Sequence, residues 1–271
     1  LDDGSGLGVL QECLGDDRAR WAIYAWRKQL LALPRSEVVE MLKRVPLKQV
    51  TVAKEVIRLL GDYAGEAGLQ LLLSYDRSSL HRDVHLALLR ALWPHLDREE
   101  AWQVWEEAAD SSDWVLASRL AEIPTVRLSA ESEARITRLF SKLLRRPELD
   151  ARLALLGRAA YIPLVDPERV LWNACAAGLS AEQPAEAVAA FNACMHRMQG
   201  GESEQLAGAL LQLKAVTSKR RILAALLGAL PNHLGPYAGK ARTDVGKHVL
   251  TGLIADPLLA PQAIRLAGTL Y

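Results

Sequence analysis

The sequence has 271 residues, a formal net charge of +1 and a hydrophobic content of 50%. This length allows one large domain or two small ones, and the near-neutral charge excludes a global field that would attract nucleic acid or an anionic membrane. The longest apolar stretches, such as residues 222–230, are far shorter than the roughly 18 to 20 residues that cross a bilayer, so we expect no membrane segment.

The types of apolar residue indicate helices. Leu and Ala dominate, whereas Phe occurs only twice and β-branched residues are sparse. Leu and Ala favour helices, while strands favour β-branched and aromatic side chains. No segment shows the period-two alternation of a half-buried strand. The composition therefore predicts an all-α protein.

The first segment of the chain is rich in glycine. Gly4, Gly6 and Gly8 lie close together, and we expect residues 1–15 to form a flexible N-terminal segment. Helical spacing of apolar residues follows at once, beginning with Ile23 and Trp26. We predict that residues 16–271 form a single helical domain.

Prolines divide the rest of the chain into segments with helical periodicity, at boundaries where a missing N–H and a fixed φ do least harm. The segments form pairs, and we name the second helix of each pair the B helix. Successive B-helix starts differ by 31 to 39 residues. One such pair cannot bury its apolar faces alone, so neighbouring pairs must stack. The pattern predicts about six to seven antiparallel pairs, with B helices beginning near Lys48, Ser79, Asp113, Glu148, Gln183, Ser218 and Pro257.

The B helices share a polar motif. Three of them carry an Asp near the start, at Asp83, Asp113 and Asp150, and an Arg follows six to eight residues later in each. This motif resembles the HEAT and armadillo-like helical repeats, from about Lys48 onward. The resemblance implies a right-handed α-solenoid, HEAT-like in its pairs, whose B helices line the concave face.

The recurring arginines are the candidate binding residues. Cations outnumber carboxylates by thirteen to eight along the predicted B helices, and a guanidinium group can bind a carboxylate or phosphate through two parallel hydrogen bonds. We therefore predict a non-catalytic scaffold that binds another protein or peptide, an acidic one in particular, on its concave face. Alternatively, each Arg pairs with the Asp of a neighbouring B helix and only ties the stack together. The residues concerned are Arg58, Arg90, Arg119, Arg158 and Arg265.

A cluster of tryptophans allows a different function. Trp102, Trp105 and Trp114 lie in one short window, and aromatic rings beside cations suit single-stranded nucleic acid or a flipped base. The chain resembles HEAT-like DNA alkylation glycosylases in size, with Asp113 and Arg119 near these rings. Nucleic-acid binding or glycosylase activity is therefore the alternative. The near-zero net charge argues against it, and indole rings at helical spacing are typically packing anchors.

Other chemistry is not indicated. His81 and His85 share a helix face, but the sequence places no further metal ligand beside them, so we expect neither a metal site nor a cofactor. We found no catalytic motif. A third interpretation is suggested by the first residue, Leu1 rather than Met: the chain would be the sensor or spacer arm of a larger multidomain protein.

The chain contains three cysteines, an odd number. In an antiparallel helix pair, Cys175 and Cys194 would be offset by roughly 12 Å along the axis, beyond the roughly 7 Å between Cα atoms that a disulfide tolerates. Free thiols favour a reducing compartment, and we expect a cytoplasmic protein.

Overall fold

The structure is a computed structural model, and it describes residues 7–63, 65–122, 129–162, 164, 166 and 168–271. Within these ranges every regular element is a helix, which confirms the all-α prediction. The chain divides into two compact units, Leu1–Ile123 and Pro124–Tyr271, which we name the N-terminal and C-terminal units. Each has its own buried residues. The single domain over residues 16–271 stays a prediction.

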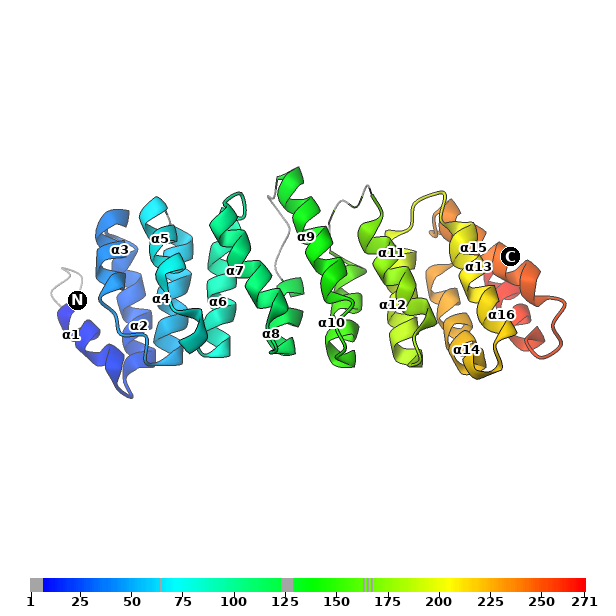
Figure 1. The fold of residues 1–271 in the computed structure, drawn as a ribbon, viewed down its shortest axis with the longest axis horizontal. Coiled ribbons are helices and arrows are strands. Elements are labelled where there is room, and N and C mark those ends of the chain that lie inside the picture. Colours follow the sequence, from blue (N-terminus) through cyan, green and yellow to red (C-terminus); the bar gives the residue numbers. More distant parts are fainter. Residues whose placement is uncertain (1–6, 64, 123–128, 163, 165, 167) are drawn as a thin grey trace. The chain divides into compact units, whose positions relative to one another are not determined.

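The helices of the N-terminal unit form two layers (Figure 1). In one layer α2 packs on α4, α4 on α6, and α6 on α8. In the other, α3 packs on α5, and α7 contacts both α6 and α8. The elements are α1 (Leu7–Glu12), α2 (Ala19–Leu30), α3 (Arg35–Lys43), α4 (Val50–Tyr63), α5 (Glu66–Ser74), α6 (Arg82–Leu92), α7 (Glu99–Asp110) and α8 (Trp114–Arg119).

The C-terminal unit has the same kind of arrangement. One layer runs from α10 through α12 and α14 to α16, and in the other α9 packs on α11 and α13 on α15. The elements are α9 (Ala130–Leu143), α10 (Leu149–Ala159), α11 (Val170–Ala177), α12 (Pro184–Arg197), α13 (Ser203–Gln212), α14 (Arg220–Ala229), α15 (Lys240–Leu253) and α16 (Ala260–Leu270).

The helix starts agree with the predicted B helices. Each of α4, α6, α8, α10, α12, α14 and α16 begins within three residues of its predicted start. One difference lies at the N-terminal side, where α2 occupies the same layer as α4 although the pattern predicts no B helix there. Within the predicted flexible segment 1–15, residues 7–12 form α1, and Cys13 and Leu14 are buried. Residues 1–6 lie outside the described ranges.

Leucines and a few aromatic side chains fill the two cores. Trp26, Trp102 and Trp105 are almost fully buried in the N-terminal unit, as are Trp172 and Phe191 in the C-terminal unit. Burying each such side chain stabilises the fold by roughly 1.5–3 kcal/mol. Because helices meet mainly through apolar side chains, these contacts hold the layers together.

Small residues allow α4 and α6 to pack closely against each other. A Cβ atom placed on Gly61 of α4 would lie 2.8 Å from the Cβ of Ala91 in α6 and 2.9 Å from its Cα. The helices α4 and α6 can pack this closely only because position 61 has no side chain.

Ion pairs link residues at a recurring sequence separation. Arg77 pairs with Glu107, 30 residues later, and Arg152 pairs with Glu186, 34 residues later. A third pair follows in the C-terminal unit, where Arg169 and Glu202 are 33 residues apart. Each of these ion pairs therefore links neighbouring helix pairs within one unit.

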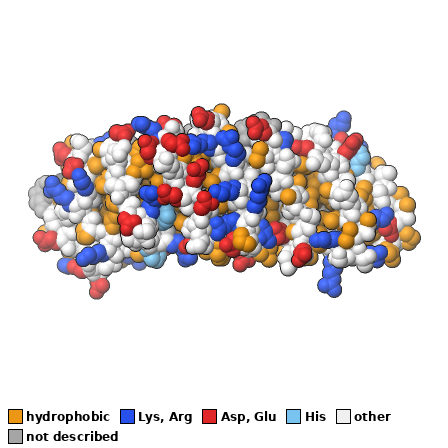
Figure 2. Space-filling model, in the orientation of Figure 1, with side chains coloured by type: hydrophobic (Ala, Val, Ile, Leu, Met, Phe, Trp, Pro, Cys, Tyr) orange, Lys and Arg blue, Asp and Glu red, His pale blue; other side chains and the backbone are white. Residues whose placement is uncertain are grey.

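The surface carries charges of both signs. Figure 2 shows Lys and Arg side chains beside Asp and Glu side chains on the face in view, in keeping with a net charge of +1. None of the helices in the described ranges combines the length and the hydropathy that crossing a membrane requires.

Candidate binding groove

Three helices of the N-terminal unit, α4, α6 and α8, line a groove of about 230 Å³. Five cationic side chains and two carboxylates contribute to its lining, together with a few apolar side chains. The cations are Lys54, Arg58, Arg82, Arg90 and Arg119, and the carboxylates are Asp83 and Glu122. The groove is therefore basic within a nearly neutral protein.

The spacing of the residues along each helix brings them into the groove. Lys54 and Arg58 are four residues apart on α4, and Arg82 and Arg90 are eight apart on α6. Residues at i and i+4 lie on the same face of a helix. The opposite faces are apolar and buried in the core, which leaves these side chains at the groove.

One buried carboxylate organises the α4 side of the groove. Glu55 is only 3% exposed, and it accepts hydrogen bonds from Arg58 at 2.5 Å and from Arg27 of α2 at 3.4 Å. A buried carboxylate needs such partners because burial of an unpaired charge is costly. Arg27 and Arg58 supply them, while the Arg58 side chain remains 45% exposed.

A second, exposed carboxylate joins α6 to α8. Glu122 lies in the 3₁₀ turn Leu120–Glu122 that follows α8. Its Oε2 atom accepts a hydrogen bond from Arg90 Nη2 at 3.4 Å, and its Oε1 atom accepts one from Arg119. Both arginine side chains remain about half exposed, at 51% and 48%.

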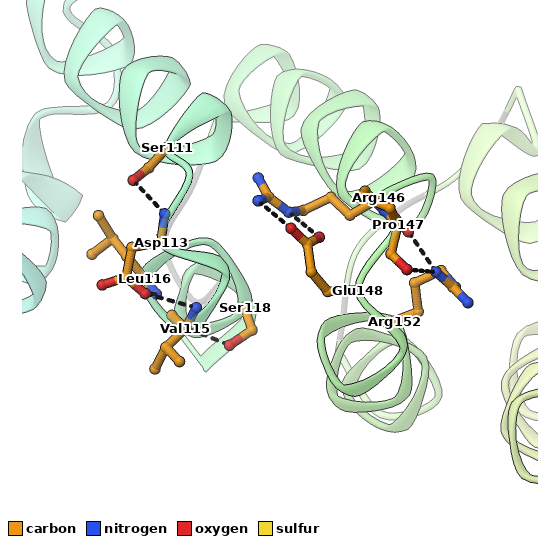
Figure 3. A network of polar contacts seen from close by, with 9 residues as sticks. All are labelled: Ser111, Asp113, Val115, Leu116, Ser118, Arg146, Pro147, Glu148 and Arg152. Atoms are coloured by element: carbon orange, nitrogen blue, oxygen red, sulfur yellow. Dashed lines mark hydrogen bonds and ion pairs between the residues drawn. The ribbon is translucent and has the colours of Figure 1, made fainter.

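Asp113 has a local structural role. Its carboxylate accepts hydrogen bonds from the N–H groups of Val115 and Leu116, at 3.0 and 3.3 Å, and so caps the N-terminus of α8 (Figure 3). The Asp113 side chain also lies 3.9 Å from Arg82 of α6. The expected pairing is between a recurring arginine and such an Asp, but Arg58, Arg90 and Arg119 pair with glutamates instead.

The structure brings three of the five candidate arginines together. Arg58, Arg90 and Arg119 line the groove, whereas Arg158 in α10 and Arg265 in α16 belong to the C-terminal unit. Lys54 and Arg82 also line the groove. The four-residue spacing from Lys54 to Arg58 is the sequence signal that could have identified Lys54.

The tryptophans have a packing role. Trp102 and Trp105 are 2% and 1% exposed, and their rings meet edge-on with centroids 6.5 Å apart. Trp105 also donates a hydrogen bond from Nε1 to the carbonyl oxygen of Leu89 at 3.3 Å. These two rings are therefore not accessible to a ligand, which corrects the expectation of aromatic contacts for Trp102 and Trp105. Trp114, the first residue of α8, is half-buried.

The C-terminal unit contains a larger cavity of about 890 Å³, between the α9–α10 and α11–α12 pairs. Its polar wall includes Arg152 and Glu186, which bind each other through two hydrogen bonds. Figure 3 shows the Arg152 side chain directed at the carbonyl oxygens of Arg146 and Pro147, both at 2.7 Å. Because its guanidinium group already makes these hydrogen bonds, Arg152 stabilises the cavity wall.

In the C-terminal unit Cys175 and Cys194 are buried, and His233 is half-buried. His233 Nε2 lies 2.8 Å from Asn192 Oδ1, and burial together with nearby His196 and Arg242 lowers the pKa of His233 to about 4. Burial raises the pKa of the Cys175 thiol to about 12. Cys175 and Cys194 are free, as is Cys13 of the N-terminal unit.

The groove is suited to binding anions. Guanidinium and ammonium groups donate hydrogen bonds and accept none, and four of the five groove cations are arginines. In the part of the chain that the structure describes, no three His, Cys, Asp or Glu side chains gather as metal ligands would. No protein-family model matches the sequence, and no curated protein matches it significantly.

Proposed function

We propose that this protein is a non-catalytic scaffold that binds an acidic segment of another protein in the groove between α4, α6 and α8. The observation that carries the proposal is the concentration of five cations in one groove. Arg58, Arg90 and Arg119 come from three different helices, and about half of each side chain is exposed. A partner lying across the helices can reach all three.

The ion pairs already present in the groove are weak enough for a partner to replace them. Exposed ion pairs typically contribute only about 0.2–1 kcal/mol, so exchanging the contacts of Arg90 and Arg119 for a partner's carboxylates costs little. A partner carboxylate also gains hydrogen bonds to a planar guanidinium fork. Several such contacts in one groove favour a segment with several acidic residues over a single acid.

We also propose that the two units are stretches of a right-handed, HEAT-like α-solenoid with its B helices on the concave face. The layered packing within each unit supports this, as do the B-helix starts and the ion pairs separated by 30 to 34 residues. The three free cysteines support a cytoplasmic location. As an arm of a larger protein, the chain would present the same groove.

Nucleic acid is the rival ligand, because arginines also bind phosphate. The burial of Trp102 and Trp105 withdraws two of the three tryptophans on which a single strand or a flipped base would stack. A fluorescence-anisotropy titration separates the two ligands. The whole chain is titrated with fluorescein-labelled decaglutamate, decalysine, and single- and double-stranded oligonucleotides, at low and moderate salt.

Saturable binding of decaglutamate alone, weakened by salt, supports the proposal. Replacing Arg58, Arg90 and Arg119 by Ala should weaken it about tenfold, since each contact contributes about 0.5 kcal/mol, and should reduce its salt dependence. The matched control removes three exposed cations, Arg35 and Lys43 of α3 and Arg44 directly after it, and should change affinity less than twofold. Tight oligonucleotide binding, no decaglutamate binding, or equal effects of the two triple variants would refute the proposal. Circular dichroism confirms that both variants fold.

A further inference from the structure

Glu122 already occupies a place in the groove where a partner's acid would bind. Its two carboxylate oxygens accept hydrogen bonds from cations on different helices, Arg90 of α6 and Arg119 of α8. The Glu122 side chain is 41% exposed and contributes to the groove lining. Glu122 therefore bridges Arg90 and Arg119 in the way that a carboxylate of the proposed partner would bridge them.

The comparison with Glu55 shows what is particular to Glu122. Both carboxylates bridge two arginines, but the Glu55 side chain is 3% exposed and Glu55 does not contribute to the groove lining. An external acid cannot replace a buried carboxylate without unfolding its surroundings. Glu122, by contrast, can swing into solvent while its arginines stay at the groove. Of the two bridges, that of Glu122 is exchangeable.

We infer that Glu122 is an internal competitor of the partner, and that binding exchanges its carboxylate for one supplied by the partner between Arg90 and Arg119. This inference rests on the proposed function. The competitor is tethered, and a short tether gives an effective concentration on the order of millimolar. A lone carboxylate is thus a poor ligand. A segment whose other acids are held by Lys54, Arg58 and Arg82 displaces Glu122, so the groove selects partners with several acids.

The test replaces Glu122→Gln, which removes the charge and keeps the shape. The control is Asp83→Asn, which removes one charge from the same groove at a residue that bridges no pair of arginines among the described contacts. We expect E122Q to bind labelled decaglutamate roughly fivefold more tightly and D83N less than twofold more tightly. Free acetate should compete at lower concentrations with E122Q than with the wild type.

A second measurement separates exchange from general electrostatics. When Arg90 and Arg119 are both replaced by Ala, adding E122Q should no longer raise the affinity more than adding D83N does. If E122Q and D83N raise the affinity for decaglutamate equally in the otherwise wild-type protein, the inference is wrong and the proposed function still stands. If the wild type fails to bind decaglutamate, both fall. Both carboxylates lie at the surface of the groove, and circular dichroism verifies that the variants fold.

Discussion

Arg152 and Glu186 form a bidentate ion pair that fastens α10 to α12. Arg152 Nε donates to Glu186 Oε1 at 2.5 Å and Nη2 donates to Oε2 at 2.8 Å. The hydrogen bonds to Glu186 raise the pKa of Arg152. Glu186 is buried, and among the described contacts Arg152 is the cation that compensates its charge.

We predict that Arg152→Ala lowers the free energy of unfolding by about 3–5 kcal/mol, because it leaves a buried carboxylate without its cation. Urea denaturation followed by circular dichroism measures the change. The control is Arg98→Ala, which removes an exposed ion pair with Glu66 and should cost at most about 1 kcal/mol. Similar losses in the two variants would show that the buried pair has no special role.

Gly61→Ala should destabilise the protein by about 1–3 kcal/mol, since the added methyl group meets Ala91 at a distance that real Cβ atoms do not adopt. Gly157→Ala is the matched control, because that glycine lies in α10 with nothing within 4 Å of the new Cβ. There the substitution should stabilise the helix by about 0.5–1 kcal/mol. Thermal melts should show a lower melting temperature for Gly61→Ala and a higher one for Gly157→Ala. A higher melting temperature for Gly61→Ala would contradict the tight α4–α6 contact.

Asp113→Ala should cost about 0.5–2 kcal/mol through loss of the N-terminal cap of α8. Asp113→Asn keeps a side-chain acceptor and should recover most of that loss. Amide hydrogen exchange at Val115 and Leu116 is the direct measurement, because those two N–H groups lose their acceptor. If Asn performs no better than Ala, the charge of Asp113 matters rather than its hydrogen bonds.

The low pKa of His233 predicts a loss of stability in acid. The folded protein holds this imidazole neutral down to pH of about 4, whereas in the unfolded chain it takes up a proton below about 6.5. The unfolded state thus binds more protons between these values, and stability falls as the pH drops from about 6.5 to about 4. His233→Gln should flatten this part of the stability profile. His248→Gln, at an exposed histidine, is the matched control for the substitution itself.

Local rules explain why the helix boundaries could be predicted. Pro184 lies at the start of α12 and Asp113 caps α8, and both features can be read from a short window of sequence. The layer position of α2 could not be predicted in this way. This helix is apolar on two sides, since Ile23 and Trp26 are buried while Trp21 and Tyr24 on the opposite side are exposed. Periodicity alone does not say which stripe faces a neighbour.

The groove was predictable only in part. Arg58, Arg90 and Arg119, which the recurring arginine pattern singles out, all line the groove. Glu122 comes after the end of α8, and only the folded chain shows that it reaches Arg90, 32 residues earlier in the sequence. Similarly, the spacing of Trp102 and Trp105 places both on one helix face, but burial decides that this face points into the core.

The buried thiols of the C-terminal unit can report how often part of its fold opens. Cys175 in α11 and Cys194 in α12 are both fully enclosed, and burial raises the pKa of each. A thiol reagent needs the exposed thiolate, so it can modify these two residues only while the α11–α12 pair is transiently apart. The rate of labelling therefore counts openings of that pair under native conditions, without denaturant and without any engineered probe.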